Sequence, residues 1–163
     1  NQTWSIEHIL PRSLVNGKLP GAAEDDFFGF DVAHRTLNAV RSNLPLVLWP
    51  NDLRVGVVSI DGVKHFNPPA ENRDRLARRW LYARATYSTI DYLAPPSAAQ
   101  RKHADEIIEL VRASPLSYVE GRFHGLLVSY VRAAYRVEWG NPLCRRDSPD
   151  YERALALARE LAF

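Results

Sequence analysis

Trp4-Ser-Ile-Glu7-His8-Ile-Leu-Pro11 is the stretch of sequence from which the fold can be predicted. Its first residues alternate between apolar and polar side chains, as those of a strand do, and Pro11 ends regular strand pairing. We therefore expect a strand that ends close to the Glu7-His8 pair. Consecutive side chains of a regular strand point to opposite faces, so Glu7 and His8 can serve one site only where the strand ends or bulges.

The second informative stretch is Leu37-Asn38-Ala-Val-Arg41-Ser-Asn43-Leu-Pro45. Its apolar residues have helical spacing and Pro45 stops the pattern, so residues 34–43 predict a short helix. Residues 27–33 before it predict a second strand. Residues 16–26 are rich in Gly, Pro and acidic side chains, which indicates a loop. The predicted order is strand, loop, strand and short helix.

The remainder of the chain predicts a hairpin followed by helices. Residues 55–60 and 63–66 are rich in β-branched side chains, and the Asp61-Gly62 pair between them is typical of a two-residue hairpin turn. After Pro68-Pro69, apolar residues recur at helical spacing. The expected helices cover residues 72–93, 102–113, 117–137 and the stretch from the start signal Ser148-Pro149-Asp150 to Ala162. This order of elements predicts an α+β fold in one domain.

Composition excludes several classes of protein. The 163 residues are 46% hydrophobic and 25% charged, which are globular averages and exclude a disordered or low-complexity chain. No apolar run is long enough for a membrane helix, and no signal peptide is visible. The single cysteine, Cys144, excludes an internal disulfide and a cysteine-based zinc site. A secreted and a cytoplasmic location both stay open.

The positive charge is carried mostly by arginine. The net charge is only +2, but 18 of the 21 basic residues are Arg. The planar guanidinium suits phosphate better than the ammonium of Lys does, although a GC-rich genome would produce the same bias. The arginines at 73–84, Arg78 among them, predict either a solvated helix face or a set of phosphate contacts.

The residue types in the two stretches suit the hydrolysis of a phosphodiester. That reaction needs a base of near-neutral pKa to activate water and a divalent cation to neutralise the phosphoryl oxygens. His8 is the natural base. The Glu7 carboxylate and the Asn38 amide oxygen are hard ligands of the kind that Mg²⁺ prefers. The alternative is a purely structural interpretation, in which Glu7 is a surface acid beside a half-buried His8. In that case Asn38 is solvated and Asn43 caps the C-terminus of the helix.

Taken together, the two stretches resemble the endonuclease I family of ββα-metal nucleases, which are also called His-Me finger or HNH-like nucleases. Glu7-His8-Ile-Leu-Pro11 is similar to the strand motif of that family, and Asn38-Ala-Val-Arg41-Ser-Asn43 is similar to its helix motif. Further short matches follow in the order of the family, at Pro68-Pro69, Ala77-Arg78, Tyr82, the stretch Ser114 to Glu120, and Gly140-Asn141-Pro142.

The resemblance implies a ββα-metal core over residues 3–45, an additional hairpin over 54–66 and a helical part over 72–163. It implies that His8 is the general base and that Glu7 and Asn38 ligate one Mg²⁺, which Mn²⁺ or Ca²⁺ could replace. The remaining implied site residues are Arg41, as a catalytic or supporting residue, and Arg12, Asn43 and Arg78, as nucleic-acid contacts. The implied substrate is DNA, with RNA as a further one, cut without sequence preference to 5′-phosphate and 3′-hydroxyl ends.

Some features depart from the family and leave alternatives open. The stretch before Asn38 lacks the basic loop of many members, and the usual N-terminal helical region is absent from the sequence. A sequence- or structure-specific nuclease, or a toxin effector domain with an inhibitory protein partner, therefore stays open. So does an inactive nucleic-acid-binding module. His34 either flanks the site or is structural. We expect all four tryptophans in the core rather than as base-stacking platforms: Trp4, Trp49, Trp80 and Trp139.

Overall fold

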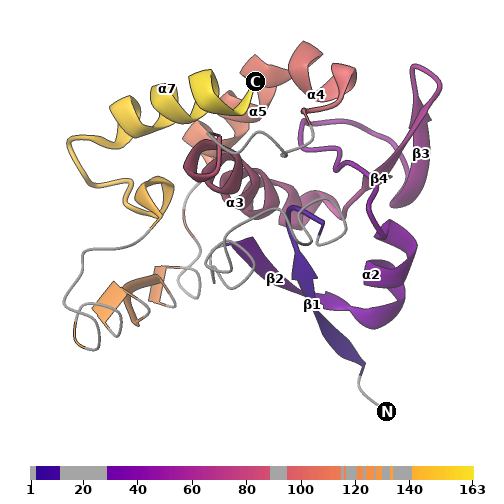
Figure 1. Cartoon of the computed structure of the whole chain (residues 1–163), viewed down its shortest axis with the longest axis horizontal. Helices are drawn as coiled ribbons and strands as arrows, with labels where there is room; N and C mark the ends of the chain where they lie inside the picture. The colour runs from indigo at the N-terminus through magenta and orange to yellow at the C-terminus, as the bar shows by residue number, and fades with distance from the viewer. Residues whose placement is uncertain are drawn as a thin grey trace.

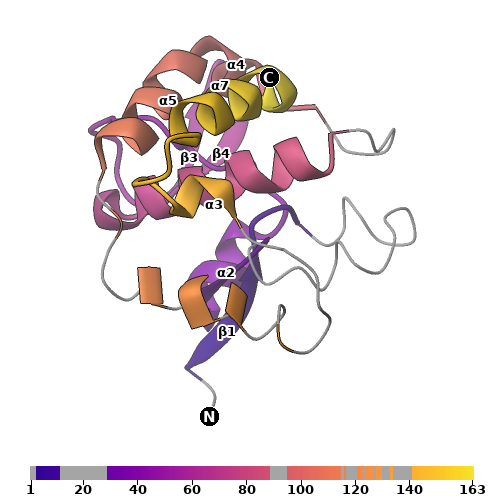
Figure 2. The same ribbon diagram turned by 90° about the vertical axis from the view of Figure 1, so that its left-hand side faces the viewer.

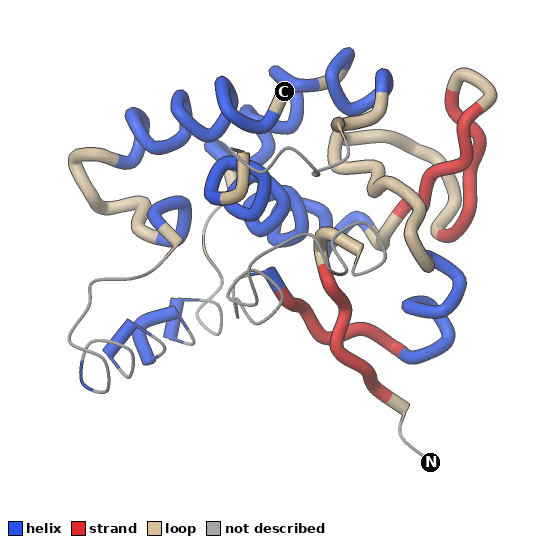
Figure 3. The backbone as a smooth tube through the Cα atoms, in the orientation of Figure 1, coloured by secondary structure: helices blue, strands red, loops and turns tan. Residues whose placement is uncertain are grey.

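The computed structural model is described for residues 3–11, 29–88, 95–114, 116, 121–122, 124–126, 128–129, 133 and 141–163. The described residues form two antiparallel pairs of strands and a set of helices (Figure 1), which confirms the α+β prediction. Figure 3 shows the two strand pairs apart from each other, and helix α2 contacts both of them.

The first strand pair joins β1 (Trp4–His8) to β2 (Phe30–His34). The register sets Trp4 opposite His34, Glu7 opposite Asp31 and His8 opposite Phe30. The ladder is regular and β1 ends at His8, as the sequence predicts. Helix α2 (Arg35–Arg41) follows β2 directly, within the residues that predict a short helix, and it ends at Ser42, which has a φ of 49°.

One face of the first strand pair is exposed. Trp4, Ile6 and Val32 share that face, and each is 62% exposed. The expectation that Trp4 lies in the core is therefore wrong, whereas Trp49 and Trp80 are buried as expected. Trp139 lies outside the described residues. The other face of the pair carries Glu7, which is buried.

The second strand pair is a tight hairpin of β3 (Gly56–Ile60) and β4 (Val63–Asn67). Its turn residues Asp61 and Gly62 have φ values of 50° and 78°, the left-handed backbone that a two-residue hairpin turn requires. The prediction for this hairpin is confirmed. Leu46 forms an isolated bridge to Phe66, which joins the segment after α2 to β4.

The helices pack mainly against one another (Figure 2). After the short 3-10 helix η3 (Ala70–Asn72), α3 (Arg73–Thr86) contacts both α5 (Ala104–Ala113) and α7 (Tyr151–Ala162). A second 3-10 helix, η4 (Pro142–Cys144), contacts α3 and α7. The most deeply buried side chains include Ile9, Val47, Leu48, Leu81, Ile107, Val111, Leu143 and Leu155. These side chains form one core that spans the helices and the segment after α2.

Several predicted helix boundaries differ from the structure. The helix expected over 102–113 is two helices, α4 (Ala98–Lys102) and α5, separated at His103. Ser97 and Gln100 form a capping box at the start of α4, a signal that the sequence contained. Helix α7 begins at Tyr151, because Ser148 accepts the N–H of Asp150 in a turn before the helix. The end of the helix expected over 72–93 and most of that over 117–137 lie outside the described residues.

The arginines of α3 do not form a solvated face. Arg73, Arg78 and Arg84 are buried, and Arg78 is only 1% exposed. Arg84 donates from Nε to the carbonyl of Ala162 at 3.0 Å and lies over the Trp80 ring at 5.4 Å. The predicted contact of Arg78 with nucleic acid finds no support in this position, because its guanidinium lies inside the protein, 3.5 Å from Asp74.

The remaining predictions from composition concern membranes and cysteine. Among the helices that the structure describes, none is long and apolar enough to cross a membrane. Cys144 is free and buried.

Candidate functional site

Asn38 fastens helix α2 to strand β1. Its Nδ2 donates to the hydroxyl of Ser5 at 3.0 Å and to the carbonyl of Ile6 at 2.9 Å. These two bonds use both hydrogens of the amide nitrogen. No described residue donates a hydrogen bond to Oδ1 of Asn38, so the amide oxygen is the group left for an external partner.

Arg41, the last residue of α2, holds the end of β1. Its Nη1 donates to Oε1 of Glu7 and to the carbonyl of His8, and its Nη2 donates to the carbonyl of Ile9 at 2.7 Å. Arg41 is 4% exposed and Glu7 is 7% exposed, so the ion pair is buried. The guanidinium is therefore occupied inside the protein. These contacts favour the supporting role of Arg41 over the catalytic one.

The Glu7 carboxylate has one oxygen that the fold does not satisfy. Oε1 accepts from Arg41, whereas Oε2 is buried and has no hydrogen-bond partner among the described residues. Burial raises the pKa of Glu7, and the attraction of Arg41 opposes that shift only in part. Burial likewise lowers the pKa of Arg41. An unsatisfied buried oxygen is costly, so a ligand at Oε2 would relieve that cost.

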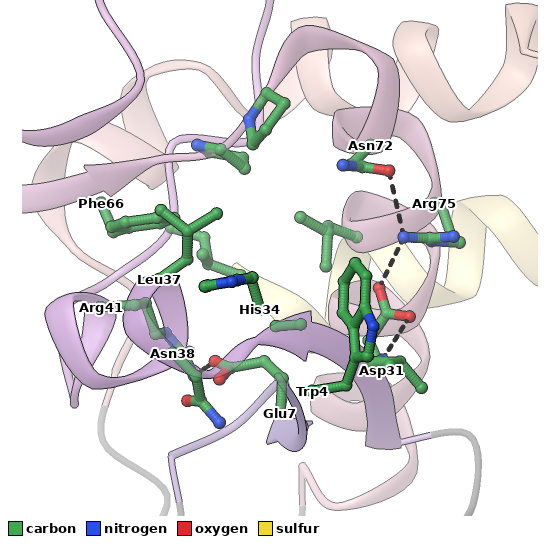
Figure 4. A pocket seen from close by; sticks show the side chains of 16 residues that line it. Trp4, Glu7, Asp31, His34, Leu37, Asn38, Arg41, Phe66, Asn72 and Arg75 are labelled. Carbon is green, nitrogen blue, oxygen red and sulfur yellow. Dashed lines mark hydrogen bonds and ion pairs between the residues drawn. The ribbon is translucent and has the colours of Figure 1, made fainter. Parts of the chain in front are cut away.

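A pocket of about 250 Å³ brings Glu7 and Asn38 together (Figure 4). Its walls include the apolar side chains of Trp4, Leu37 and Phe66. On the opposite side, Arg75 donates from Nη2 to Oδ1 of Asn72 and also pairs with Asp31, each at 3.1 Å. The other lining residues are Val32, Ala33, His34, Arg41, Leu46, Pro68, Pro69 and Leu76.

The oxygens of this pocket fit a magnesium ion better than a transition metal. Among the described residues, no three His, Cys, Asp or Glu side chains are placed to hold a metal together. A metal here would rest on one carboxylate, that of Glu7, on the amide oxygen of Asn38, and on water and substrate oxygens. Mg²⁺ is usually held in this way, by one or two protein oxygens completed by water and phosphate.

The two histidines near the pocket have different surroundings. His8 is half-buried on the face opposite to Glu7, where its ring meets Phe30 edge-on at 4.7 Å, and it does not line the pocket. His34 does line the pocket, and its Nδ1 accepts the N–H of Thr36 at 3.3 Å. The sequence signal for His34 was its place before α2, which left its role open.

Of the other predicted site residues, Asn43 lies apart from this pocket. Asn43 is exposed and lines a second pocket of about 190 Å³, on the side of Arg41 that faces Pro11 and Trp80. Arg12 lies outside the described residues. The structure therefore brings together Glu7, Asn38 and Arg41, and it leaves His8 next to them in sequence but on the opposite face of β1.

Comparison with protein-family models, with curated proteins and with solved structures gives no match for this chain. The family resemblance therefore rests on the short motifs alone.

Proposed function

We propose that this chain is a Mg²⁺-dependent endonuclease that hydrolyses phosphodiester bonds of DNA without strong sequence preference, with RNA as a further substrate. One observation carries the proposal: Asn38 of α2 is hydrogen-bonded to β1, so that Asn38 and Glu7 line one pocket beside the end of the strand. The order of β1, β2 and α2 agrees with a ββα-metal core over residues 3–45.

Glu7 and Asn38 would hold the metal. Arg41 binds Oε1 of Glu7, which fixes the carboxylate and leaves Oε2 as the ligand atom. Ser5 and Ile6 fix the amide nitrogen of Asn38, which orients Oδ1 in the same manner. When bound there, Mg²⁺ would neutralise the phosphate and stabilise the leaving oxygen, and Mn²⁺ or Ca²⁺ could take the same ligands.

His8 is the general base of this proposal. His34 is less suited to that role because its Nδ1 already accepts a hydrogen bond, so its neutral ring carries the proton on Nε2. In-line displacement needs the attacking water and the leaving oxygen on opposite sides of the phosphorus. Glu7 and His8 face opposite ways, so the two can reach one phosphate only because β1 ends at His8.

The reaction then follows from these positions. His8 would take a proton from water as the hydroxide attacks the phosphorus, the bond to the 3′-oxygen would break, and a proton from a solvent water would convert the leaving oxygen to a hydroxyl. The products are 5′-phosphate and 3′-hydroxyl ends. The chain's own site residues would contact the sugar–phosphate backbone, which is common to all sequences, so the proposed cleavage has little sequence preference.

A plasmid-nicking assay tests the proposal. Wild type, His8→Ala and His34→Ala are each incubated with supercoiled plasmid, once with Mg²⁺ and once with EDTA. We expect wild type to cut only with Mg²⁺, and His8→Ala to cut about 10²- to 10⁴-fold more slowly, the usual contribution of a general base. His34→Ala tests the other histidine near the pocket; because it removes the capping bond to Thr36, we expect a smaller loss of activity than for His8→Ala rather than none.

Other outcomes would change the assignment. If His34→Ala is inactive and His8→Ala cuts normally, His8 is not the base. If no protein cuts with any divalent cation and all of them retard DNA on a gel, the chain is a binding module and the nuclease proposal is wrong.

A further inference from the structure

Like Val32, Trp4 is an exposed residue in the wall of the candidate pocket, and it presents a large aromatic ring there. It is 62% exposed, and it lines the pocket that holds Glu7 and Asn38. An indole is the largest apolar side chain, so leaving it in water forgoes a large gain in hydrophobic free energy. Ile6 is equally exposed on the same face but does not line the pocket. The position of Trp4 at the pocket, rather than its exposure alone, points to a binding role.

The neighbours of Trp4 leave a stacking position open. His34 lies opposite Trp4 in the strand register, with the two ring centres 5.9 Å apart and the planes at 76°. The imidazole is therefore nearly perpendicular to the indole and does not stack on it in parallel. No other ring in the described part of the chain is found against Trp4.

The pocket has the size and the chemistry for one flat ring with polar edges. Its volume of about 250 Å³ is just below the roughly 300–1,000 Å³ of pockets for drug-sized ligands. Trp4, Leu37 and Phe66 supply apolar surface, and the polar side chains of Asn72 and Arg75 lie on another side of the same space, as Figure 4 shows. A nucleobase needs this combination, because its faces stack on aromatic rings and its edges form hydrogen bonds.

We propose that this pocket binds one unpaired nucleobase, stacked on Trp4, from the strand whose phosphate reaches Glu7 and Asn38. A base inside a duplex is covered by its neighbours and its partner, so only an unpaired or extruded base can enter such a pocket. The protein therefore prefers single-stranded or locally unpaired nucleic acid. This inference rests on the proposed nuclease function for the identity of the ligand.

Binding without cleavage tests the role of Trp4. A short fluorescein-labelled oligodeoxythymidylate and an abasic backbone of equal length and charge are titrated with protein in EDTA, and anisotropy reports affinity. We expect Trp4→Ala to weaken binding of the oligodeoxythymidylate by about 5- to 150-fold, which corresponds to one base stacked on an aromatic ring. Wild type should bind the abasic backbone more weakly than the oligodeoxythymidylate by the same factor. Trp4→Ala should bind the two probes with equal affinity.

Two variants control this experiment. Trp4→Phe keeps an aromatic face and should retain most of the affinity, and it keeps the test valid if Trp4→Ala unfolds in a thermal melt. Ile6→Ala removes an equally exposed apolar side chain outside the pocket and should bind as wild type does. If Trp4→Ala weakens both probes equally, the indole does not recognise a base and the inference is overturned.

Cleavage separates this inference from the proposed function. With Mg²⁺, wild type should cut a single-stranded oligonucleotide faster than the matching duplex, and Trp4→Ala should lose that difference. An unchanged ratio in a Trp4→Ala protein that still cuts would overturn the inference and leave the nuclease proposal standing. A protein that cuts nothing but binds the base-bearing probe through Trp4 would support the inference and overturn the nuclease proposal.

Discussion

The two hairpins of this protein have strands of equal length but are held together differently. The β3–β4 hairpin closes through the two-residue turn Asp61-Gly62, so its register follows from local turn chemistry. The strands β1 and β2 are separated by residues 9–29. Besides their own backbone ladder, side chains of α2 and α3 bind them. Asn38 and Arg41 bind β1 from α2, and Arg79 of α3 donates to the carbonyl of Phe30 in β2.

The two hairpins also differ in which of them carries the proposed catalytic residues. A hairpin with a tight turn needs no other part of the chain to set its register, and β3–β4 carries none of the proposed catalytic residues. The hairpin that carries Glu7 and His8 depends on buried polar contacts with α2. The same side chains therefore hold the fold and shape the site, and substitutions there should affect both.

The largest effect is expected for Arg41→Ala. This change removes the partner of a buried carboxylate, together with two hydrogen bonds to the carbonyls of His8 and Ile9. Leaving one charge of a buried pair alone costs about 3 to 5 kcal/mol. Urea denaturation of the variant and of wild type measures the difference in the free energy of unfolding.

A paired substitution separates the lost charge partner from the lost packing. Arg41→Met with Glu7→Leu removes both charges and keeps similar volume, so most of the stability should return, while Mg²⁺-dependent cleavage should not. If the double variant is as unstable as Arg41→Ala, the bonds to the carbonyls of His8 and Ile9 dominate instead.

A smaller effect is expected from glycine substitutions, one in each hairpin. Gly62→Ala forces an L side chain into a backbone with φ of 78°, which should cost about 1 to 2 kcal/mol. Gly29→Ala, beside β2, meets no heavy atom within 4 Å and has no such φ, so it should be neutral or stabilise by up to about 1 kcal/mol. Thermal unfolding of the two variants measures both changes in stability. Equal losses of stability would mean that the left-handed φ of Gly62 does not set the cost of its substitution.

The smallest effect is expected for the ion pair of Arg75 and Asp31, which links α3 to β2 at 3.1 Å. The Arg75 side chain is 35% exposed, so solvent screens the pair and its contribution should stay below about 1 kcal/mol. A double-mutant cycle with Arg75→Met and Asp31→Asn isolates the coupling energy. A coupling as large as that of Arg41 and Glu7 would mean that α3 holds β2 as firmly as α2 holds β1.

Local patterns predicted much of the fold. The Asp61-Gly62 turn defined β3 and β4, and the end of β1 and the position of α2 followed from alternation and from helical spacing. Patterns of this kind say which residues share a face, but not which face is covered. Trp4 was therefore expected in the core although its face is open, and Arg78 was expected on the surface although α3 is packed on several sides.

The candidate site was predictable in its residues but not in its geometry. Glu7, Asn38 and Arg41 stood out by type and spacing, and the structure brings them together. The burial of the Glu7–Arg41 pair and the place of His34 in the pocket depend on how α2 lies on β1. No local signal encodes that packing, because it is fixed by contacts between residues far apart in the sequence.

The bonds of Arg41 also bear on the order of folding. They join groups 32 to 34 residues apart in the chain, and the entropy lost on closing a loop grows with its length. A hairpin with a two-residue turn closes within microseconds, before long-range contacts form. We therefore expect β3–β4 to fold early and the β1–β2–α2 unit to assemble late. A newly made chain would then hold its β3–β4 hairpin before Glu7 and Asn38 are brought together.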